Sequence, residues 1–245
     1  MNDPARSTLV DQTVVIVGGS SGVGLAIARL ASQSGAKKVV LIGRSRDKLA
    51  SAATDVGGGN VDIAPADMVD SAALTAAIRS AGTIDHLVLT AVADEKKRIG
   101  GIAALSDAQM EGAIDKLRGF FFAARAAAPI LRERGSMIFT SGASALKPSA
   151  RMSILAAVNA SVVTLAHALA IELAPVRVNA LTPGVVDTPI HQGEEREGIR
   201  RWAESELPAR RFGQPSDLAH AALFLMTNPY VTGQNLVVDG GLVAR

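Results

Sequence analysis

The segment VVIVGGSSGVG at residues 14–24 decides the fold, because it joins an apolar run to a helical pattern through a glycine-rich turn. Residues 14–17 form a short β-branched run bounded by glycine, which is typical of a buried strand. Residues 23–34 then place apolar side chains at helical spacing, and Gly35 marks the end of that helix. The segment therefore predicts a first strand–turn–helix unit.

The same alternation of strand and helix patterns continues along the chain. Short strands alternating with helices require crossover connections, which predict a mostly parallel sheet covered on both faces. No linker or repeat divides the chain, so residues 1–245 are expected to form a single doubly wound α/β domain of the Rossmann type. Further strands are predicted over 38–42, 61–64, 87–90, 137–140, 176–181 and 235–238, and helices over 47–54, 71–80, 106–132 (with Ser106 as N-cap), 153–174 and 217–226.

Composition excludes several classes of protein. The chain has 25 basic and 23 acidic residues, a net charge of +2, and no basic block, so no nucleic-acid partner is expected. It has no cysteine, which excludes disulfides and thiolate chemistry. No uninterrupted apolar run reaches membrane-spanning length, and the first twelve residues lack a targeting segment, so a cytoplasmic protein is expected. No metal is predicted, since no pair among the four histidines has ligand spacing: His86, His167, His191 and His220.

The glycine-rich turn is a candidate phosphate site. Glycine lets the backbone approach a pyrophosphate closely, and the start of the following helix supplies free N–H donors. Glycine turns also simply connect strands to helices, but the position in a first strand–helix unit favours phosphate binding. The candidate residues are Gly18, Ser20, Ser21, Gly22, Val23 and Gly24.

The end of the second predicted strand suggests which dinucleotide the turn would bind. A carboxylate at this position accepts hydrogen bonds from a ribose 2′-hydroxyl and repels a 2′-phosphate. The sequence instead has Arg44, Ser45 and Arg46 after Gly43. Guanidinium groups pair with phosphate through charge-assisted hydrogen bonds, so NADP(H) is predicted in preference to NAD(H). The alternative is that the two arginines only cap a surface turn.

Two segments interrupt the alternation. Residues 92–105 carry a charged run at 94–98 (Asp94, Glu95, Lys96, Lys97 and Arg98), which is interpreted as solvated surface. Residues 191–208 follow a strand's carboxyl end, where open α/β sheets bind ligands. This lid-like segment, about 190–210, is either a mobile cover with Trp202 and Leu207 facing a substrate or a surface helix.

These motifs resemble those of the short-chain dehydrogenase/reductase family over essentially the whole chain. Residues 17–24 are similar to its T-G-x-x-x-G-x-G pattern, with Val17 in place of threonine. The resemblance places Asp67 and Met68 at the adenine, and Thr90 and Ala91 where the family has N-N-A-G. It places Pro183, Gly184, Val186 and Thr188 in the loop that flanks the nicotinamide. It implies a nicotinamide-dependent oxidoreductase that acts on a small molecule as a homotetramer or homodimer.

The catalytic positions depart from the family pattern. The family uses a tyrosine as general acid/base and a lysine four residues later, on the same helix face. Aligned on residues 170–174 and Asn179, these positions fall on Leu155 and Asn159. Leucine has no exchangeable proton, and the chain's single tyrosine, Tyr230, lies near the last strand. The usual proton donor is therefore absent.

The remaining catalytic positions are also altered. The family's serine falls on Gly142, or on Ser141 with a one-residue shift, and its helix asparagine falls on Lys116. Lys116 is the candidate proton donor, with Ser141 and Asn159 as hydrogen-bond donors to the substrate oxygen; Asn159 also remains a candidate ligand of the cofactor ribose. The alternative is that Lys116 forms a structural salt bridge.

Three hypotheses follow for the function. The first is an NADP(H)-dependent transfer of hydride to or from a small carbonyl, imine or activated alkene, with an atypical proton path. The second is a non-catalytic NADP(H)-binding sensor or inactive partner subunit. The third is a lyase or isomerase that reuses the pocket, which the retained nicotinamide loop disfavours.

Overall fold

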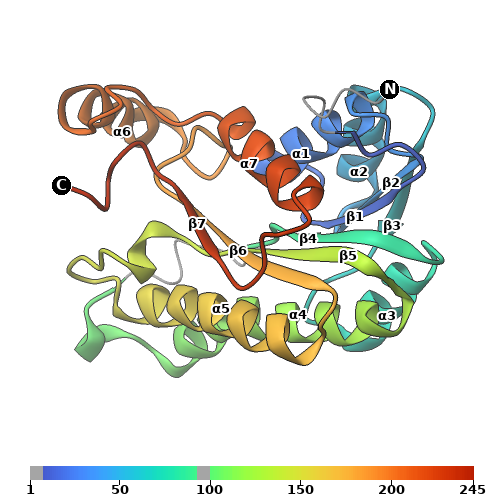
Figure 1. Cartoon of the computed structure of the whole chain (residues 1–245). Coiled ribbons are helices and arrows are strands. Elements are labelled where there is room, and N and C mark those ends of the chain that lie inside the picture. The colour runs from blue at the N-terminus through green and yellow to red at the C-terminus, as the bar shows by residue number, and fades with distance from the viewer. Residues whose placement is uncertain (1–7, 93–99) are drawn as a thin grey trace.

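The computed structural model describes residues 8–92 and 100–245, which form one parallel sheet of seven strands (Figure 1). The strand order is β3-β2-β1-β4-β5-β6-β7, and each neighbouring pair runs in the same direction. The doubly wound α/β prediction is confirmed. The strands are β1 Thr13–Val17, β2 Lys38–Gly43, β3 Val61–Pro65, β4 Ile84–Leu89, β5 Leu131–Thr140, β6 Arg177–Pro183 and β7 Asn235–Val238. The charged run predicted as surface, 94–98, lies outside the described residues.

Helices cover both faces of the sheet. One face carries α1 (Gly22–Gln33), α2 (Arg46–Val56) and α7 (Pro215–Thr227), as Figure 1 shows. The other carries α3 (Ser71–Arg79), α4 (Asp107–Ala127) and α5 (Ser153–Glu172). Helix α6 (Gly193–Glu206) stands apart at one end, and short 3-10 turns complete the described chain at η2 Ile102–Ala104, η3 Ala128–Ile130 and η4 Ala143–Ala145.

The strand order places a switch point between β1 and β4. From β1 the chain proceeds outward to β2 and β3, and it then returns to add β4 on the other side of β1. The loops after β1 and β4 therefore leave the sheet in opposite directions, which opens a crevice at the carboxyl ends of the strands. Gly18 and Thr90 begin these two loops. The predicted phosphate turn thus lies where such sheets bind ligands.

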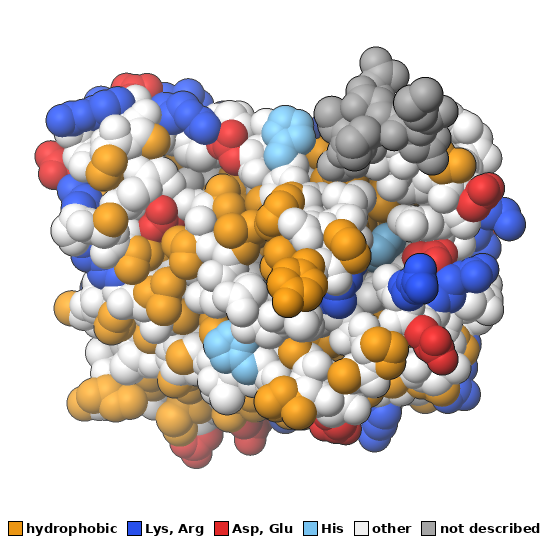
Figure 2. Space-filling model, viewed as in Figure 1, with side chains coloured by type: hydrophobic (Ala, Val, Ile, Leu, Met, Phe, Trp, Pro, Cys, Tyr) orange, Lys and Arg blue, Asp and Glu red, His pale blue; other side chains and the backbone are white. Residues whose placement is uncertain are grey.

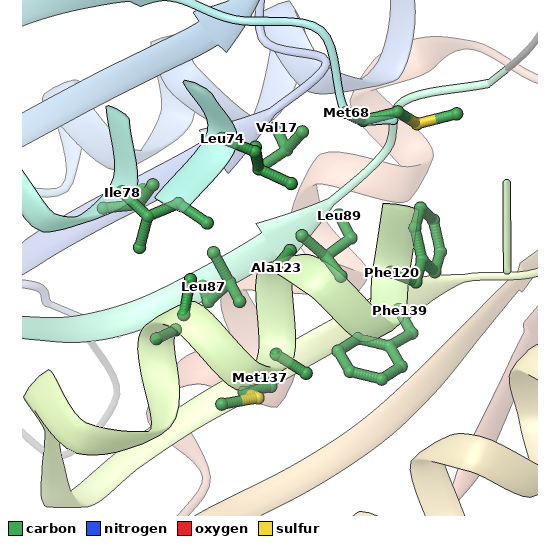
Figure 3. Packing of buried hydrophobic residues seen from close by; sticks show 14 of the residues in the cluster. Val17, Met68, Leu74, Ile78, Leu87, Leu89, Phe120, Ala123, Met137 and Phe139 are labelled. Atoms are coloured by element: carbon green, nitrogen blue, oxygen red, sulfur yellow. The ribbon is translucent and has the colours of Figure 1, made fainter. Parts of the chain in front are cut away.

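Apolar side chains fill the space between the sheet and α3–α5. All five residues of β1 are buried, because a central parallel strand has helices on both faces. Figure 3 shows Phe120 of α4 against Phe139 of β5, with ring centroids 5.8 Å apart and the planes tilted by 58°. Leu89 of β4 lies beside them, and Leu87 of the same strand belongs to the same cluster. This packing holds α4 against the sheet and so positions the other side chains of that helix.

The predicted helix over 106–132 is wrong at its end. It begins as expected, with Ser106 as N-cap in a capping box with Gln109, but it ends at Ala127. Pro129 follows, and proline has no N–H for a continuing helix. Strand β5 then starts at Leu131, six residues before the predicted 137. Residues 132–134 are exposed and charged, so the apolar pattern did not reveal this first part of the strand.

Helix α5 is long and apolar enough to cross a membrane by length and composition alone, which the search for uninterrupted apolar runs did not predict. Its side chains Val162 and Ala166 are fully buried in the cluster beneath the sheet. Only a third of its most apolar window, 33%, is buried within the chain. The helix therefore covers the sheet with one face and presents a second apolar face to its surroundings.

His86 of β4 is a structural histidine at the opposite end of the sheet from the crevice. Its ring nitrogens lie 2.9 Å from Ser136 Oγ and 2.8 Å from Gln12 Oε1. Burial, and then the nearby Arg177 guanidinium, lower the pKa of His86 to about 3. The ring is therefore neutral in the folded protein at neutral pH. His86 therefore has a structural role, in which it joins β4 to Ser136 and Gln12.

We expect this histidine to make the fold sensitive to acid. The folded-state pKa of about 3 lies below the unfolded value of 6.5, so the unfolded chain binds the proton first as pH falls. The free energy of unfolding should then fall by on the order of 1 kcal/mol per pH unit between these two values. Denaturant titrations from pH 7 to pH 4 measure this slope. In His86→Gln the slope should become shallower, and an unchanged slope would contradict the assignment.

Candidate active site

The glycine-rich turn is held by close backbone packing. Gly18 has φ +95°, and its N–H donates to Ile42 O at 2.8 Å. A Cβ on Gly18 would lie 2.5 Å from the backbone nitrogen of Ala91, and a Cβ on Gly24 would lie 2.2 Å from Gly18 O. Both contacts are with backbone, which side-chain movement cannot relieve. The turn therefore requires glycine at both positions.

The start of α1 has the properties of an anion site. Ser21 is the N-cap residue, and within the described chain its side chain makes no capping hydrogen bond. The first-turn N–H groups of a helix have no acceptor within the helix, and the helix dipole favours negative charge there. The site for Cβ on Gly22 lies 3.3 Å from Thr188 Cγ2. The turn and the predicted nicotinamide loop thus meet at Gly22.

The residues after β4 fasten this turn. Thr90 N and Ala91 N both donate to Val17 O, at 2.8 and 2.9 Å. Thr90 Oγ1 lies within hydrogen-bonding distance of Val17 O and of Gly18 O, at 3.1 and 3.2 Å. The structure thus brings these two predicted residues beside the glycine turn. Their observed contacts support its shape.

At the end of β2, the predicted residues divide into a helix cap and two exposed cations. Ser45 is the N-cap of α2, and its Oγ accepts from Lys48 N at 3.3 Å. Arg44 and Arg46 are exposed. Ser20 Oγ lies 3.7 Å from the site for Cβ on Gly43, so this strand end adjoins the glycine turn. A phosphate near Ser20 would therefore be within the field of these guanidinium groups.

Asp67 and Met68 follow β3 at the same edge of the sheet. Asp67 is half-buried, and its Oδ1 accepts from Val69 N at 3.2 Å. Met68 is buried against α4, where a Cβ on Gly119 would lie 2.9 Å from Met68 Cγ. The Met68 side chain therefore packs under this edge, which leaves Asp67 as the polar group beside it.

The predicted nicotinamide loop leaves β6 under tight constraints. Pro183 ends β6, and Gly184 N donates to Val238 O at 3.0 Å. A Cβ on Gly184 would lie 2.7 Å from Asp239 Cα. Val186 is buried and pairs with Gly213 in an isolated parallel bridge. The loop is thus fixed on both sides before it reaches Thr188.

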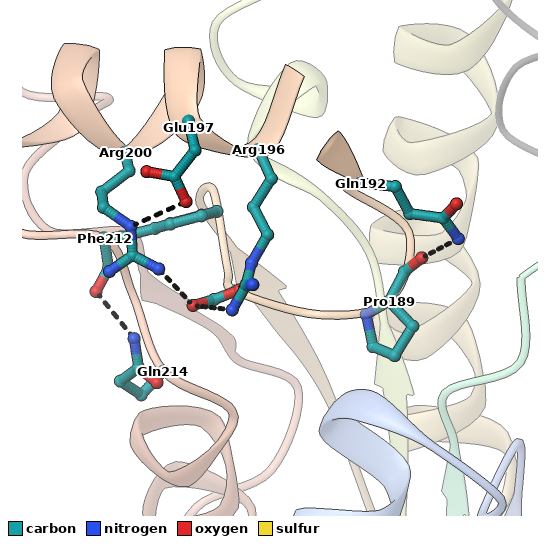
Figure 4. Close-up of polar contacts among 8 residues, drawn as sticks. Pro189, Gln192, Arg196, Glu197, Arg200, Phe212 and Gln214 are labelled. Atoms are coloured by element: carbon teal, nitrogen blue, oxygen red, sulfur yellow. Dashed lines mark hydrogen bonds and ion pairs between the residues drawn. The ribbon is translucent and has the colours of Figure 1, made fainter. Parts of the chain in front are cut away.

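Asp187 connects this loop to α6 and was missed by sequence analysis. Arg196 donates to it through Nε at 2.6 Å and Nη2 at 2.8 Å, and Arg200 adds a contact at 3.2 Å. Figure 4 labels both arginines on α6. The Arg196 hydrogen bonds, more than any other contact, lower the pKa of Asp187. The arginines lie four residues apart on one face of α6, a spacing that could have suggested a shared acidic partner.

The apolar side chains of α6 hold it to the rest of the fold. Leu207 is buried against Phe212, and Trp202 packs on the same small cluster. The Arg245 guanidinium lies 5.0 Å from the Trp202 ring centroid. The segment is therefore a helix, and the expectation that these two side chains face a substrate is not supported by their packing.

Lys116 lies inside the protein, in contact with Asn159. Its residue is 2% exposed, and Nζ donates to Asn159 Oδ1 at 2.8 Å and to Ser141 O at 3.2 Å. The Phe120 ring lies one helical turn along, with its centroid 5.7 Å from Nζ. The structure thus brings together the three residues that the sequence named as catalytic candidates. Lys116 and Asn159, which the predicted alignment places at the family's asparagine and lysine positions, are joined by a hydrogen bond.

The Ser141 hydroxyl makes a hydrogen bond within the protein. The residue is buried, and Oγ donates to the backbone oxygen of Asn159 at 2.8 Å. A serine hydroxyl has one proton. In this arrangement Ser141 has no second proton to donate to a substrate oxygen, and it instead ties the end of β5 to α5.

The gapless family position for serine, Gly142, is blocked for a side chain. A Cβ there would lie 2.7 Å from Asn159 Nδ2. That amide nitrogen donates to Ser144 Oγ at 3.0 Å. Asn159 therefore occupies the space next to Gly142 and contacts a serine that sequence analysis did not identify. Nothing in the spacing of Ser144 distinguished it from other loop serines.

Leu155 lies on α5 one turn before Asn159 and is 8% exposed. Tyr230 is 97% exposed in the segment between α7 and β7. The only tyrosine of the sequence is therefore not part of the Lys116–Asn159 group.

Comparison with known proteins identifies the family. Residues 17–243 match the family model described as Enoyl-(Acyl carrier protein) reductase. A 3-oxoacyl-[acyl-carrier-protein] reductase from Bos taurus is 30% identical over 241 residues, covering 95% of this chain and 98% of the relative.

Solved structures agree with the sequence relatives. L-sorbose reductase from Gluconobacter frateurii, complexed with NADPH and L-sorbose, has a TM-score of 0.89 at 27% identity, with 98% and 99% coverage. A short chain dehydrogenase/reductase family protein has a TM-score of 0.86 at 31% identity, covering 97% of this chain and 99% of that one. The chain therefore belongs to the short-chain dehydrogenase/reductase family of nicotinamide-dependent oxidoreductases.

Proposed function

We propose that the protein is an NADP(H)-dependent oxidoreductase whose proton path differs from that of its family. The site fits a dinucleotide in three respects: the tight glycine turn, the start of α1 without a side-chain cap, and the nearby Thr188. Cβ atoms at Gly18 and Gly24 would disrupt the turn that shapes the site. When bound, the reduced nicotinamide supplies a hydride to the substrate carbon. Gly18–Gly24 would hold the phosphates, and the loop at 183–188 would hold the nicotinamide end.

The observation that carries the proposal is the buried contact between Lys116 Nζ and Asn159 Oδ1 at 2.8 Å. A positive charge enclosed near a carbonyl site stabilises the negative charge that develops on the substrate oxygen. Lys116 and Asn159 are both buried, and a buried setting strengthens such an electrostatic effect. Lys116 thus supplies the charge that a lysine on α5 supplies in the family pattern.

The test is reduction of acetoacetyl-CoA, a 3-oxoacyl thioester, by NADPH, monitored by loss of nicotinamide absorbance. Acetoacetyl-CoA is chosen because the Bos taurus relative is named a 3-oxoacyl-[acyl-carrier-protein] reductase. A cyclic imine and an activated alkene extend the assay to the other predicted acceptors. Turnover with any of them supports the proposal, and no turnover with all three contradicts it.

One observation favours a second candidate function, a non-catalytic NADP(H)-binding protein. Leu155 stands where the family has its proton donor, and the Ser141 hydroxyl is engaged within the fold. Such a protein would act as a sensor or as an inactive partner subunit. It would bind NADPH in a fluorescence titration and show no turnover in the assay above.

Arg44 gives a test of cofactor choice. We expect Arg44→Ala to weaken NADPH binding by about 10- to 100-fold, the worth of a charge-assisted phosphate contact, and to leave NADH binding within about twofold. Nicotinamide fluorescence titration measures both affinities. Lys37→Ala, an exposed cation at the other end of β2, is the matched control. Equal affinities of the unmodified protein for NADPH and NADH would contradict the 2′-phosphate assignment.

We further propose that α6 covers the substrate side of the site. It follows the nicotinamide loop directly and is tied to it by the Asp187 ion pairs with Arg196 and Arg200. Movement of the loop at Thr188 would therefore be transmitted to the helix. Closure of such a segment excludes water from a reaction.

We also propose that the protein is a homo-oligomer. Apolar side chains on α4 and α5 are exposed, with Phe121 50% and Ile171 82% accessible. Figure 2 shows hydrophobic side chains along the lower part of the molecule, over α5. Large apolar side chains exposed on two neighbouring helices favour a subunit interface. Light scattering of the purified protein distinguishes a dimer or tetramer from a monomer.

A further inference from the structure

Ser144 contacts Asn159, and the family pattern supplies no role for it. It lies in the 3-10 turn η4, directly after β5, at the carboxyl edge of the sheet. The residue is half-buried, and its Oγ accepts from Asn159 Nδ2 at 3.0 Å. Among the residues that the structure describes, the Ser144 hydroxyl has no recorded acceptor for its own proton.

Lys116 determines which way the Asn159 amide faces. An ammonium group only donates, so the amide oxygen must face Nζ, at 2.8 Å. The amide nitrogen must then face Ser144, and it uses the serine oxygen as an acceptor. The Ser144 proton therefore points away from Asn159. The direction of donation runs from Lys116 through Asn159 to Ser144.

A hydrogen-bond chain with one direction strengthens its last donor. Each bond polarises the next, and here the first donor is the buried Nζ of Lys116. Ser141 cannot serve in the same way, because its proton is donated to Asn159 O. Of these two serines, Ser144 is thus the one whose hydroxyl proton points away from Asn159.

We propose that the Ser144 hydroxyl donates a hydrogen bond to the reacting oxygen of the substrate. Asn159 and Lys116 act behind it as positioning residues. The proposal rests on the proposed function, and it assigns to Ser144 the donor role that sequence analysis gave to Ser141 and Asn159. The hydroxyl stabilises the developing negative charge and transfers no proton.

The first experiment compares Ser144→Ala with Ser149→Ala, a matched control at an exposed serine in the same loop. We expect Ser144→Ala to lower kcat for acetoacetyl-CoA reduction about 10²-fold, as loss of one such donor does elsewhere, with KM raised no more than about tenfold. Ser149→Ala should retain kcat, and Ser144→Thr should recover most of it. Unchanged kcat in Ser144→Ala would overturn the proposal while leaving the proposed function in place.

The second experiment needs no turnover. Calorimetry measures acetoacetyl-CoA binding to the protein loaded with NADP⁺, and Ser144→Ala should bind about tenfold more weakly than the unmodified protein. Absence of turnover would contradict the proposed function, and this comparison would then decide the role of Ser144. Equal affinities, or no binding by the unmodified protein, would overturn it.

A double-mutant cycle tests the positioning role of Lys116. If Lys116 acts through Ser144, the double variant with Lys116→Met and Ser144→Ala should lose clearly less thioester affinity than the sum of the losses in the two single variants. Full additivity would show that the two side chains act separately and would overturn the relay.

Discussion

Lys116→Met is expected to lower kcat for NADPH-dependent reduction by about 10²- to 10⁴-fold, the range found when a general acid or its electrostatic equivalent is lost. Methionine retains the length and apolar stem of lysine, so the space between α4 and α5 stays filled. The charge and the hydrogen bonds to Asn159 Oδ1 and Ser141 O are lost. NADPH affinity should stay within about twofold, because the residues predicted to bind the phosphates lie on the loop after β1.

The same substitution has a structural cost that must be separated from the chemical one. Asn159 Oδ1 loses a donor in a buried setting, which destabilises the fold by about 1–3 kcal/mol. Thermal unfolding and NADPH titration therefore accompany the kinetics. Lys37→Met removes an exposed lysine and is the control for a change of charge alone. A rate unchanged by Lys116→Met, with the protein folded, would assign Lys116 to packing.

Much of the fold could be predicted from the sequence because hydrophobic periodicity and glycine placement are local signals. The segment at 14–24 specifies β1, the turn and α1, and the structure agrees within a residue or two. The first half of β5 could not be predicted, because residues 132–134 are exposed and charged there. A strand that extends beyond its helical cover has no apolar pattern to detect.

The candidate site was predicted in part. Alignment located Lys116 and Asn159, but only the structure shows that they are joined and that Asn159 fills the space beside Gly142. The orientation of Asn159, and so the roles of Ser141 and Ser144, depends on contacts between residues far apart in the chain. The Asp187 ion pairs were missed because an acidic residue in a loop gives no signal of its partner.

The largest gain in activity is expected from restoring the family's catalytic residues, and the contact between Lys116 and Asn159 predicts that two substitutions are insufficient. Leu155→Tyr with Asn159→Lys would put the stem of a second lysine where Asn159 Oδ1 now contacts Lys116 Nζ, and would bring a second ammonium group into the same buried space. Two like charges buried close together disfavour the folded, charged state. This double variant should lose several kcal/mol of folding stability, because two like charges would be buried together, and should show no gain in ketone reduction.

Adding Lys116→Asn and Gly142→Ser removes both conflicts. The amide then comes from α4 and the ammonium from α5, so the pair is exchanged and the charge is conserved. The atom that blocks a Cβ at Gly142 is Asn159 Nδ2, at 2.7 Å, and Asn159→Lys removes it. The fourfold variant should fold like the unmodified protein and raise kcat for acetoacetyl-CoA by about 10²-fold or more, the contribution of a positioned general acid. Thermal unfolding and kcat for both variants measure the difference. If the double and the fourfold variants have equal stability and equal activity, the prediction is contradicted. Lys116 and the new lysine would then lie apart, and replacing Lys116 would not be necessary.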